Sequence, residues 1–485
     1  MLRCLRHHAL PLSANSFRER QCACQRSTFM HLMRHTHPLS TTDINVPQYH
    51  DLRVSHNTIE MANLNGRNLF VLPQNFVYGN ENSSGSAVFT THQKDGNLNA
   101  MHKLTFEDAP GNILELIDSE TLLKLAKDRD GMQMLKSHFP AAGSFVRRKF
   151  FSTVLQQAAF NDLINHSSGN FLIQKMIEES NEVELCQIER MLSAQLPQLC
   201  NGCYGCRVVQ QMIERIQQQC PSRLPGFIES LAGHERQLAV AQTGSHVLQK
   251  IFKCTSFEHY DFILRAFISS PSVLESVVED KYGCRVVQLA LQQLKAELAK
   301  SQNNNVSLIF NEIVRIMKSN ALYFISHQYA NYIMQDLLSL ELETIGNRSK
   351  DRKLSEVTSA TADMEIINTI VYNLLSLSQE KHASHVVEKA FHDAPEPVLT
   401  ALMHDIFEGY ENDRDGNDAL NILMFDQYGN YVVQTMIDVA LAVKQGRRKG
   451  RIEWYNRLVE RVSLQQGRLL NFSSGKRIIS KLIEV

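Results

Sequence analysis

One seven-residue string occurs twice in this chain of 485 residues. Y-G-C-R-V-V-Q occupies residues 204–210 and returns unchanged at residues 282–288. Looser copies stand at 130–136, 168–174, 243–249, 329–335, 382–388 and 428–434, and a further fragment, S-G-K-R-I-I-S, stands at 474–480. Self-similarity of this kind indicates a repeat architecture, which has to be recognised before any single motif is interpreted.

The spacing of the copies indicates which architecture this is. The small residue of each heptad falls at positions 131, 169, 205, 244, 283, 330, 383 and 429, so the gaps are 38, 36, 39, 39, 47, 53 and 46 residues. A period of 36–39 residues with later insertions is typical of an α-helical solenoid. Apolar residues continue with helical spacing on both sides of the heptads, and no β-pattern of comparable length competes. We therefore predict an all-α fold, a right-handed α-helical solenoid (an armadillo-like crescent) of eight repeats plus flanking half-repeats.

Each heptad is expected to present a polar triplet. On a helix, positions i and i+4 share a face and position i+1 flanks it, so Cys206, Arg207 and Gln210 are predicted to share a surface patch. The two valines between them then point towards the neighbouring repeat. The eight predicted triplets are Met132/Gln133/Lys136, Asn170/Phe171/Gln174, Cys206/Arg207/Gln210, Ser245/His246/Gln249, Cys284/Arg285/Gln288, Asn331/Tyr332/Gln335, Ser384/His385/Glu388 and Asn430/Tyr431/Gln434.

The composition of the triplets suits single-stranded nucleic acid. The middle member is a flat side chain (Phe, Arg, His or Tyr) in seven of the eight copies, and flat side chains one repeat apart can stack on successive bases. Among the outer members, an Asn with a Gln suits uracil, a Glu beside a Ser suits guanine, and a Cys with a Gln leaves room for adenine. A face that is polar for solubility alone would not need the flat middle member.

These heptads and triplets resemble the repeats of the Pumilio (PUF) family of RNA-binding proteins, which bind one base per helical repeat. The resemblance covers roughly residues 105–485 and implies an array antiparallel to the RNA. Carried over residue by residue, it implies U at Asn430 with Gln434, G at Ser384 with Glu388, U at Asn331 with Gln335, A at Cys284 with Gln288, any base at Ser245 with Gln249, A at Cys206 with Gln210 and U at Asn170 with Gln174. The implied site is 5′-UGUANAUN-3′. Because some family members accommodate an extra flipped base, a nine-base UGUANNAUN site stays open.

Two triplets depart from the family pattern. The first, Met132/Gln133/Lys136, has no aromatic or Arg platform, which leaves its base undetermined. In the seventh repeat His385 stands where the family usually has Asn, although an imidazole can still stack.

The resemblance also implies a biological role. It suggests binding to single-stranded mRNA in 3′ untranslated regions, as a monomer in the cytoplasm, with translational repression or deadenylation through recruited partner proteins. The long insertions resemble those of divergent nematode members, which act in the germ line. Two alternatives stay open: an armadillo-like scaffold that binds a peptide, and an RNA-processing factor of mitochondria or the nucleolus.

Two segments are expected to lie outside the repeats. Residues 341–365 are polar and predict a flexible loop, and a second insertion lies near residues 396–420. Its acidic part, residues 408–418, is either a solvated loop or a protein docking site, because the family uses the loop between the last two repeats for partners. Acidic residues repel phosphate, so we expect this loop on the convex side.

Metal and catalytic chemistry are not indicated. Cys200, Cys203 and Cys206 are three residues apart, but zinc needs four ligands and an iron–sulfur cluster a fourth Cys. The spacing of His382, His385 and Glu388 belongs to the repeat template. No Gly-rich phosphate loop or nucleophile motif is recognisable. We expect no cofactor, no metal and no enzymatic activity.

The first 104 residues differ from the rest. Clusters of Asn, Ser, Gly, Thr and His, such as E-N-S-S-G-S and N-L-N-G-R-N, predict a mostly disordered basic and polar region. Residues 1–40 contain six Arg and one acidic residue, Glu19, which suits a mitochondrial transit peptide or a basic arm that touches RNA phosphates. The net charge of −1 excludes RNA binding through bulk charge alone. The lack of an 18-residue apolar run predicts no membrane span, and ten cysteines in this length suit a reducing intracellular compartment.

Overall fold

The computed structural model describes residues 60–64, 67–71, 114, 117–301, 303–348 and 364–483. The chain divides into two units, residues 1–53 and 54–485, and every described element belongs to the second. The interpretations of residues 1–40 therefore lie outside the described residues, as does most of the segment 1–104.

A β-hairpin departs from the prediction of disorder for residues 1–104. Strands β1 (Glu60–Leu64) and β2 (Arg67–Val71) pair antiparallel, with Leu64 opposite Arg67 and Glu60 opposite Val71. The two residues between the strands are Asn65-Gly66, the dipeptide most typical of a two-residue hairpin turn. The hairpin accounts for only ten residues of this segment, so the prediction that residues 1–104 are mostly disordered stays a prediction.

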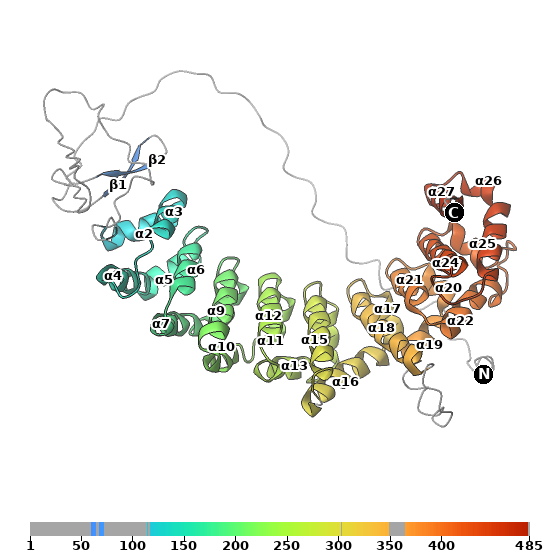
Figure 1. Cartoon of the computed structure of the whole chain (residues 1–485), viewed down its shortest axis with the longest axis horizontal. Helices are drawn as coiled ribbons and strands as arrows, with labels where there is room; N and C mark the ends of the chain where they lie inside the picture. Colours follow the sequence, from blue (N-terminus) through green and yellow to red (C-terminus); the bar gives the residue numbers. More distant parts are fainter. Residues whose placement is uncertain are drawn as a thin grey trace, which may run out of the picture. The chain divides into compact units, whose positions relative to one another are not determined.

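The rest of the described chain is a succession of short helices (Figure 1). Each heptad lies at the start of a helix, here called a heptad helix, which follows a short linking helix; a flanking helix precedes the pair from the second repeat on. The heptad helices are α3 (Arg129–Ser137), α6 (Asn170–Glu179), α9 (Gly205–Gln219), α12 (Gln242–Cys254), α15 (Gly283–Leu298), α18 (Asn331–Arg348), α21 (Ala383–Asp393) and α24 (Gly429–Lys444). The linking helices are α2 (Ser119–Lys127), α5 (Gln157–Ile164), α8 (Leu196–Asn201), α11 (Glu235–Val240), α14 (Pro271–Val278), α17 (Ala321–Ser326), α20 (Leu374–Ser378) and α23 (Ala419–Phe425). The flanking helices are α4 (Phe145–Val154), α7 (Glu182–Ser193), α10 (Leu224–Glu229), α13 (Asp261–Phe267), α16 (Asn304–Ser319), α19 (Glu365–Tyr372) and α22 (Glu396–Glu408), with short 3-10 turns η2 (Pro221–Arg223) and η3 (Phe257–His259) beside two of them.

A C-terminal half-repeat follows the eighth repeat. It consists of α25 (Glu453–Leu464), α26 (Gln466–Leu469) and α27 (Ser473–Ile483), and α27 carries the S-G-K-R-I-I-S fragment. Each heptad helix packs against the next along the chain, and α27 packs against α24 in the same way. The all-α, armadillo-like solenoid predicted from the heptad spacing is confirmed.

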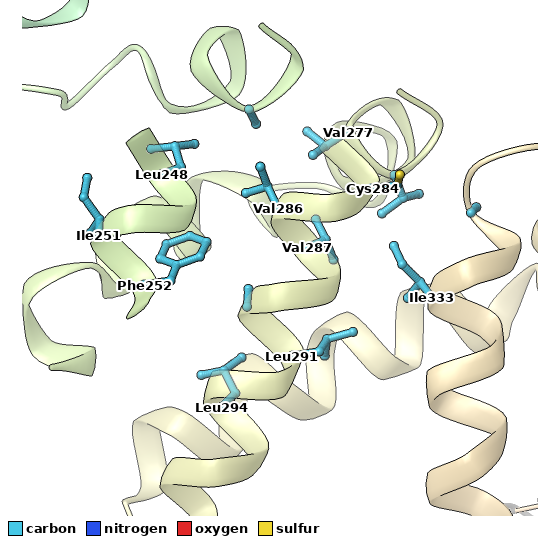
Figure 2. Close-up of a cluster of buried hydrophobic side chains, with 14 of the residues drawn as sticks. Leu248, Ile251, Phe252, Val277, Cys284, Val286, Val287, Leu291, Leu294 and Ile333 are labelled. Carbon is cyan, nitrogen blue, oxygen red and sulfur yellow. The ribbon is translucent and has the colours of Figure 1, made fainter. Parts of the chain in front are cut away.

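A single apolar core runs through the stack, from Leu114 to Ile479. Figure 2 shows the part between α12, α15 and α18, where Val286 and Val287 point into the core from the heptad of α15. Phe252 reaches the same core from α12 and Ile333 from α18. The valines of the heptad are therefore the contact surface between repeats, as predicted, because a repeat of this size cannot bury its apolar faces alone.

The small residue of the heptad is required by close packing. A Cβ at Gly283 would lie 2.1 Å from the carbonyl oxygen of Val277, and a Cβ at Gly205 would lie 2.9 Å from that of Leu199. Gly169 has φ −58°, an ordinary helical value, so the requirement is for space rather than for a left-handed backbone. The linking helix crosses the start of the heptad helix at this point.

One side chain holds the turn between the linking and heptad helices. In repeat five Asp280 Oδ1 accepts hydrogen bonds from the backbone N–H groups of Tyr282 (2.7 Å) and Gly283 (2.9 Å). In repeat six the Nδ1 atom of His327 accepts from Tyr329 and Ala330, both at 3.2 Å. An imidazole nitrogen can accept here only when it is unprotonated, so this turn needs neutral His327.

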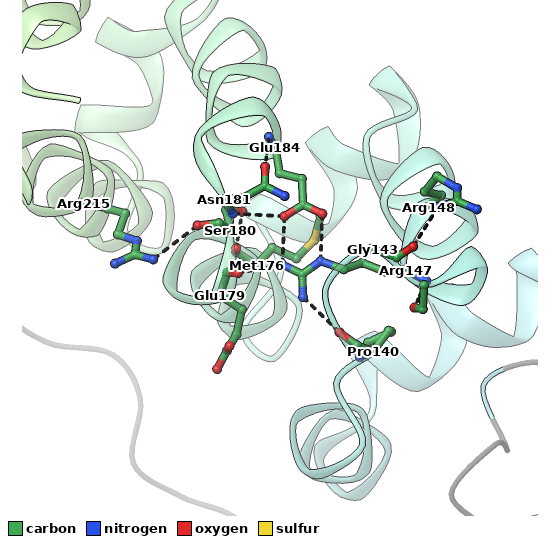
Figure 3. A network of polar contacts seen from close by, with 11 residues as sticks. Pro140, Gly143, Arg147, Arg148, Met176, Glu179, Ser180, Asn181, Glu184 and Arg215 are labelled. Atoms are coloured by element: carbon green, nitrogen blue, oxygen red, sulfur yellow. Dashed lines mark hydrogen bonds and ion pairs between the residues drawn. The ribbon is translucent and has the colours of Figure 1, made fainter. Parts of the chain in front are cut away.

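A buried arginine joins repeats two and three (Figure 3). Arg147 of α4 pairs with both carboxylate oxygens of Glu184 in α7, at 2.7 and 2.8 Å. Its guanidinium also donates to the carbonyl oxygens of Pro140 (2.9 Å) and Glu179 (2.6 Å). The guanidinium has four hydrogen-bond contacts, and these offset the cost of removing the two charges from water.

The predicted insertions are shorter than expected. Residues 341–348 continue α18 and are not a loop: Glu341 is buried, pairs with Lys318 of α16 at 3.1 Å and accepts from the backbone N–H of Ile367 at 2.9 Å. Residues 349–363 lie outside the described part. In the second insertion, residues 396–408 form α22, because their apolar residues pack into the core, and only residues 409–418 form a loop.

Candidate nucleic-acid interface

The three members of each triplet differ in exposure. The middle members are exposed, with Phe171, Tyr332 and Tyr431 at 41%, 39% and 44%, and the last members of triplets two to eight are partly buried. The first members are almost covered: Asn170 and Ser245 are each 1% exposed. The prediction that all three share an exposed patch is therefore wrong for the first member.

The last member is also less open than a shared surface patch requires. Gln335 of repeat six is partly buried beside Asn331, and its Nε2 donates to Asn331 Oδ1 at 3.0 Å. Of the three residues predicted to face solvent in this repeat, only Tyr332 is exposed. The prediction for Gln335 is therefore corrected: its amide is partly buried rather than fully exposed, because Asn331 covers one side of it.

The first member is covered because it caps the preceding turn. Asn170 Nδ2 donates to the carbonyl oxygens of His166 (2.8 Å) and Ser167 (2.9 Å), and Ser245 Oγ donates to Gln242 at 2.9 Å. The Sγ atoms of Cys206 and Cys284 make longer contacts of the same kind. The buried first member is here called the floor of the triplet, and the flat side chain beside it projects from the surface.

The three predicted uracil triplets share one geometry. In each, the Gln Nε2 donates to the Asn Oδ1: Gln174 to Asn170 at 2.8 Å, Gln335 to Asn331 at 3.0 Å and Gln434 to Asn430 at 3.0 Å. This contact fixes which end of each Gln amide lies next to the Asn. It leaves the Gln Oε1 and the second amide hydrogen free to pair with a base edge that offers one donor and one acceptor, as uracil does.

The predicted guanine triplet carries a partly buried carboxylate. Glu388 Oε1 lies 3.2 Å from His385 Nδ1, and Glu388 Oε2 accepts from Thr435 of the next repeat at 3.4 Å. Burial raises the pKa of Glu388 above its ordinary value, while His385 acts in the opposite direction. When ionised, the carboxylate can accept from two N–H groups, which is what guanine offers.

The two Cys triplets have the same residues but different surroundings. In repeat three, Gln210 Nε2 donates to the carbonyl oxygen of Cys206 at 3.1 Å. In repeat five, Gln288 Nε2 instead donates to Asp336 of the next repeat at 2.8 Å. The guanidinium of Arg285 donates to Gln288 Oε1 at 2.9 Å and stacks on Tyr332, 4.4 Å from the ring centre.

Two further features lie along the row of triplets. In repeat one, Met132 is buried in the core, and Lys136 reaches over the ring of Phe171 at 5.9 Å, so this repeat contributes to its neighbour's platform. Between repeats four and five lies an open hollow of about 290 Å³. Its lining consists of Ser245, His246, Gln249, Tyr282, Arg285, Gln288, Leu289 and Gln292.

The cysteine and histidine motifs are separated by the fold. Cys200 lies in the last turn of α8 and is buried, Cys203 is exposed in the turn that follows, and Cys206 lies at the floor of its triplet. Burial raises the pKa of the Cys200 and Cys206 thiols, which disfavours the thiolate that binds metal. Within residues 117–483, where described, no three His, Cys, Asp or Glu side chains converge as metal ligands. No helix in the described part is long and apolar enough to span a bilayer.

Two residues of the interface were not predicted. Asp336 and Thr435 each follow the last triplet member of their own repeat and contact the last triplet member of the preceding one. The position is recognisable in the sequence, as the residue after each Gln or Glu. Its direction towards the preceding repeat depends on how neighbouring helices stack, which the heptad pattern does not contain.

The fold and the site together define a class of protein: an α-solenoid that carries a row of flat and amide side chains, spaced one repeat apart. A family model described as "NOP9-like PUF repeat domain" matches residues 156–283 and 290–447, and a "Pumilio-family RNA binding repeat" matches residues 279–300. The chain belongs to the PUF repeat family.

Relatives from Caenorhabditis elegans are similar over most of the chain. Pumilio domain-containing protein 5 is 32% identical over 401 residues, which cover 80% of this chain and 68% of the relative. Fem-3 mRNA-binding factor 2 is 30% identical over 398 residues, which cover 76% of this chain and 60% of the relative, so the chain matches somewhat more than half of that protein's length. Among solved structures, PUF-6 in complex with 5BE13 RNA has 28% identity and a TM-score of 0.63, covering 78% of this chain and all of the other.

Proposed function

We propose that this protein binds single-stranded mRNA at a UGUA-containing element, about 5′-UGUANAUN-3′, in 3′ untranslated regions and represses translation or stability through recruited partners in the cytoplasm. The observation that carries the proposal is the row of triplets, in which an exposed flat side chain stands beside a partly buried amide or carboxylate in repeat after repeat. The similarity to PUF-6, whose structure contains RNA, supports the same interface. In this proposal the protein supplies the address on the message and no catalysis.

The protein's small net charge suits binding by stacking and base-edge contacts. Platforms that stack on bases contribute about 1–3 kcal/mol each, independently of bulk charge. The cations Arg207 and Arg285 lie within the row itself, where a guanidinium can serve as a platform as well as a charge. The hollow between repeats four and five adjoins the triplet that accepts any base, which keeps both eight- and nine-base elements open.

A binding comparison tests the proposal. The full chain is titrated into fluorescent UGUAUAUA, ACAAUAUA and the nine-base UGUAUUAUA. We expect at least one UGUA-containing RNA to bind at least about tenfold more tightly than ACAAUAUA, since the loss of three base-edge pairs costs about 1–3 kcal/mol each. Equal binding to all three RNAs would contradict base recognition and favour the peptide-binding scaffold.

The acidic loop between α22 and α23 is the proposed docking site for repressor or deadenylase proteins. Asp413 Oδ1 accepts from the backbone N–H groups of Asp415 (2.9 Å) and Asn417 (2.7 Å), and Asp418 pairs with Arg461 of α25. Residues 411–416 are exposed. An exposed loop that already has a defined shape loses little conformational entropy when a partner binds.

Two variants separate the shape of this loop from its charge. Asp413→Ala removes the acceptor that holds the turn, whereas Asp413→Asn keeps an acceptor and removes the charge. With the protein tethered to a reporter mRNA, we expect Asp413→Ala to lower repression while RNA affinity stays within about twofold, because surface changes are worth less than about 0.5 kcal/mol elsewhere. Unchanged repression by both variants would place the docking site elsewhere.

A further inference from the structure

Repeats three and five carry the same heptad, Y-G-C-R-V-V-Q, yet their glutamines have different neighbours. The next repeat along the chain supplies the difference, at the residue directly after its own last triplet member. This residue is Lys250 in repeat four, which follows repeat three, and Asp336 in repeat six, which follows repeat five. Lys250 pairs with Glu214, whereas Asp336 accepts from Gln288 Nε2 at 2.8 Å.

Gln288 is held at both ends of its amide. A carboxylate only accepts hydrogen bonds, so it must face the Nε2 end, and a guanidinium only donates, so Arg285 must face Oε1. Turning the amide over would set Oε1 against the carboxylate and the NH₂ group against the guanidinium. Gln210 is held by its Nε2 end on the neutral carbonyl of Cys206, which is a weaker restraint.

The orientation of an amide decides which bases it can pair with. Adenine and cytosine present an amino donor beside a ring-nitrogen acceptor, whereas guanine and uracil present a carbonyl acceptor beside a ring N–H donor. The order of donor and acceptor along the base edge is opposite in the two pairs. An amide that can turn over accepts both kinds of edge, and an amide fixed in one orientation accepts one kind.

We propose that Asp336 is a specificity-determining positioning residue for repeat five. It fixes the Gln288 amide so that repeat five accepts an amino base, adenine in the proposed element, and rejects guanine and uracil. Repeat three, with the same triplet and no such carboxylate, discriminates less. This inference rests on the proposed function, because it deepens the recognition of the fourth base.

The experiment measures base preference at two positions of one RNA. Wild-type full chain and the Asp336→Asn variant are titrated with UGUAUAUA and with RNAs that carry G or U at the fourth base or at the sixth. Asn matches Asp in size, but its amide can present either a donor or an acceptor to Gln288. The Gln288 amide is then no longer fixed in one orientation. Asp336→Glu keeps a carboxylate and serves as the conservative variant.

In the wild type we expect the preference for A over G and U to be at least about fivefold larger at the fourth base than at the sixth. Asp336→Asn is expected to lower the fourth-base preference to the sixth-base level, without change at the sixth base, and Asp336→Glu to restore part of it. An unchanged fourth-base preference, or an equal loss of affinity for every RNA, would overturn the inference and leave the proposed function standing. Failure of the wild type to distinguish UGU from ACA would overturn both.

Discussion

At the scale of the single residue, the first member of each triplet has a structural role that its chemistry alone does not reveal. Asn430 Nδ2 donates to the carbonyls of Asp426 and Gln427, and its Oδ1 accepts from Gln434. Burial follows from these contacts, since a side chain that caps the turn below it cannot also stand free at the surface. Helical spacing predicted which three residues lie together, and it correctly placed the flat members at the surface. It could not predict the covered floor, or the half-covered amide of Gln335, because these contacts depend on the conformation of the turn.

His327 makes one turn sensitive to pH. Burial lowers the pKa of His327 below its ordinary value, and nearby Glu279 opposes that shift. Since the folded pKa lies below the unfolded value of about 6.5, the unfolded chain binds the proton more readily, and the stability contributed by this turn is present above about pH 6.5 and is lost as the pH falls towards the folded pKa. We expect His327→Asp, which copies Asp280 of repeat five, to remove this part of the pH dependence.

The measurement is the denaturant midpoint of both proteins at pH 7.5 and pH 5.5. A helix cap contributes about 1 kcal/mol to the free energy of unfolding. Between pH 7.5 and pH 5.5 the wild type should therefore lose up to about 1 kcal/mol more unfolding free energy than His327→Asp. Equal losses would show that the imidazole does not hold the turn.

At the scale of the element, the heptad predicted where each helix of the interface begins but not how far it runs. Residues 341–348 are polar in the sequence and nevertheless helical, because Glu341 finds buried partners in α16 of its own repeat and in α19 of the next. The hairpin of β1 and β2 was missed for a different reason. Its Asn65-Gly66 signal was present in the sequence but was outweighed by the polar composition around it.

The Gly of the heptad gives a prediction at this scale. Gly283→Ala places a Cβ 2.1 Å from the Val277 carbonyl oxygen, a backbone atom that cannot move alone, so α14 and α15 must separate. We expect a loss of about 1–3 kcal/mol in unfolding free energy, the usual cost of overpacking. Gly226 lies inside α10 with nothing within 4 Å of its added Cβ, so Gly226→Ala is the matched control and should be neutral or stabilising by up to about 1 kcal/mol. Equal effects in thermal or denaturant unfolding would refute the packing explanation.

At the scale of the whole molecule, the array has a direction. Heptad helices follow one another from α3 to α24 in chain order, so triplets far apart in the chain should recognise bases far apart in the RNA. The order of the triplets along the array could be predicted in full from the sequence, because the repeats stack in the order in which they occur in the chain. The polarity against the RNA comes from the family resemblance, and it is therefore the property to test directly.

That test exchanges one triplet near each end of the array. Ser384→Asn with Glu388→Gln converts the repeat-seven triplet to the uracil type, and Asn170→Ser with Gln174→Glu converts the repeat-two triplet to the guanine type. Binding of each double variant is measured against UGUAUAUA carrying every base at the second and at the seventh position. We expect a switch from G to U at the second base for the first variant and from U to G at the seventh base for the second, with all other preferences unchanged. Switches at the opposite ends would reverse the polarity, and variants that weaken binding to all RNAs without any switch would contradict base recognition by the triplets.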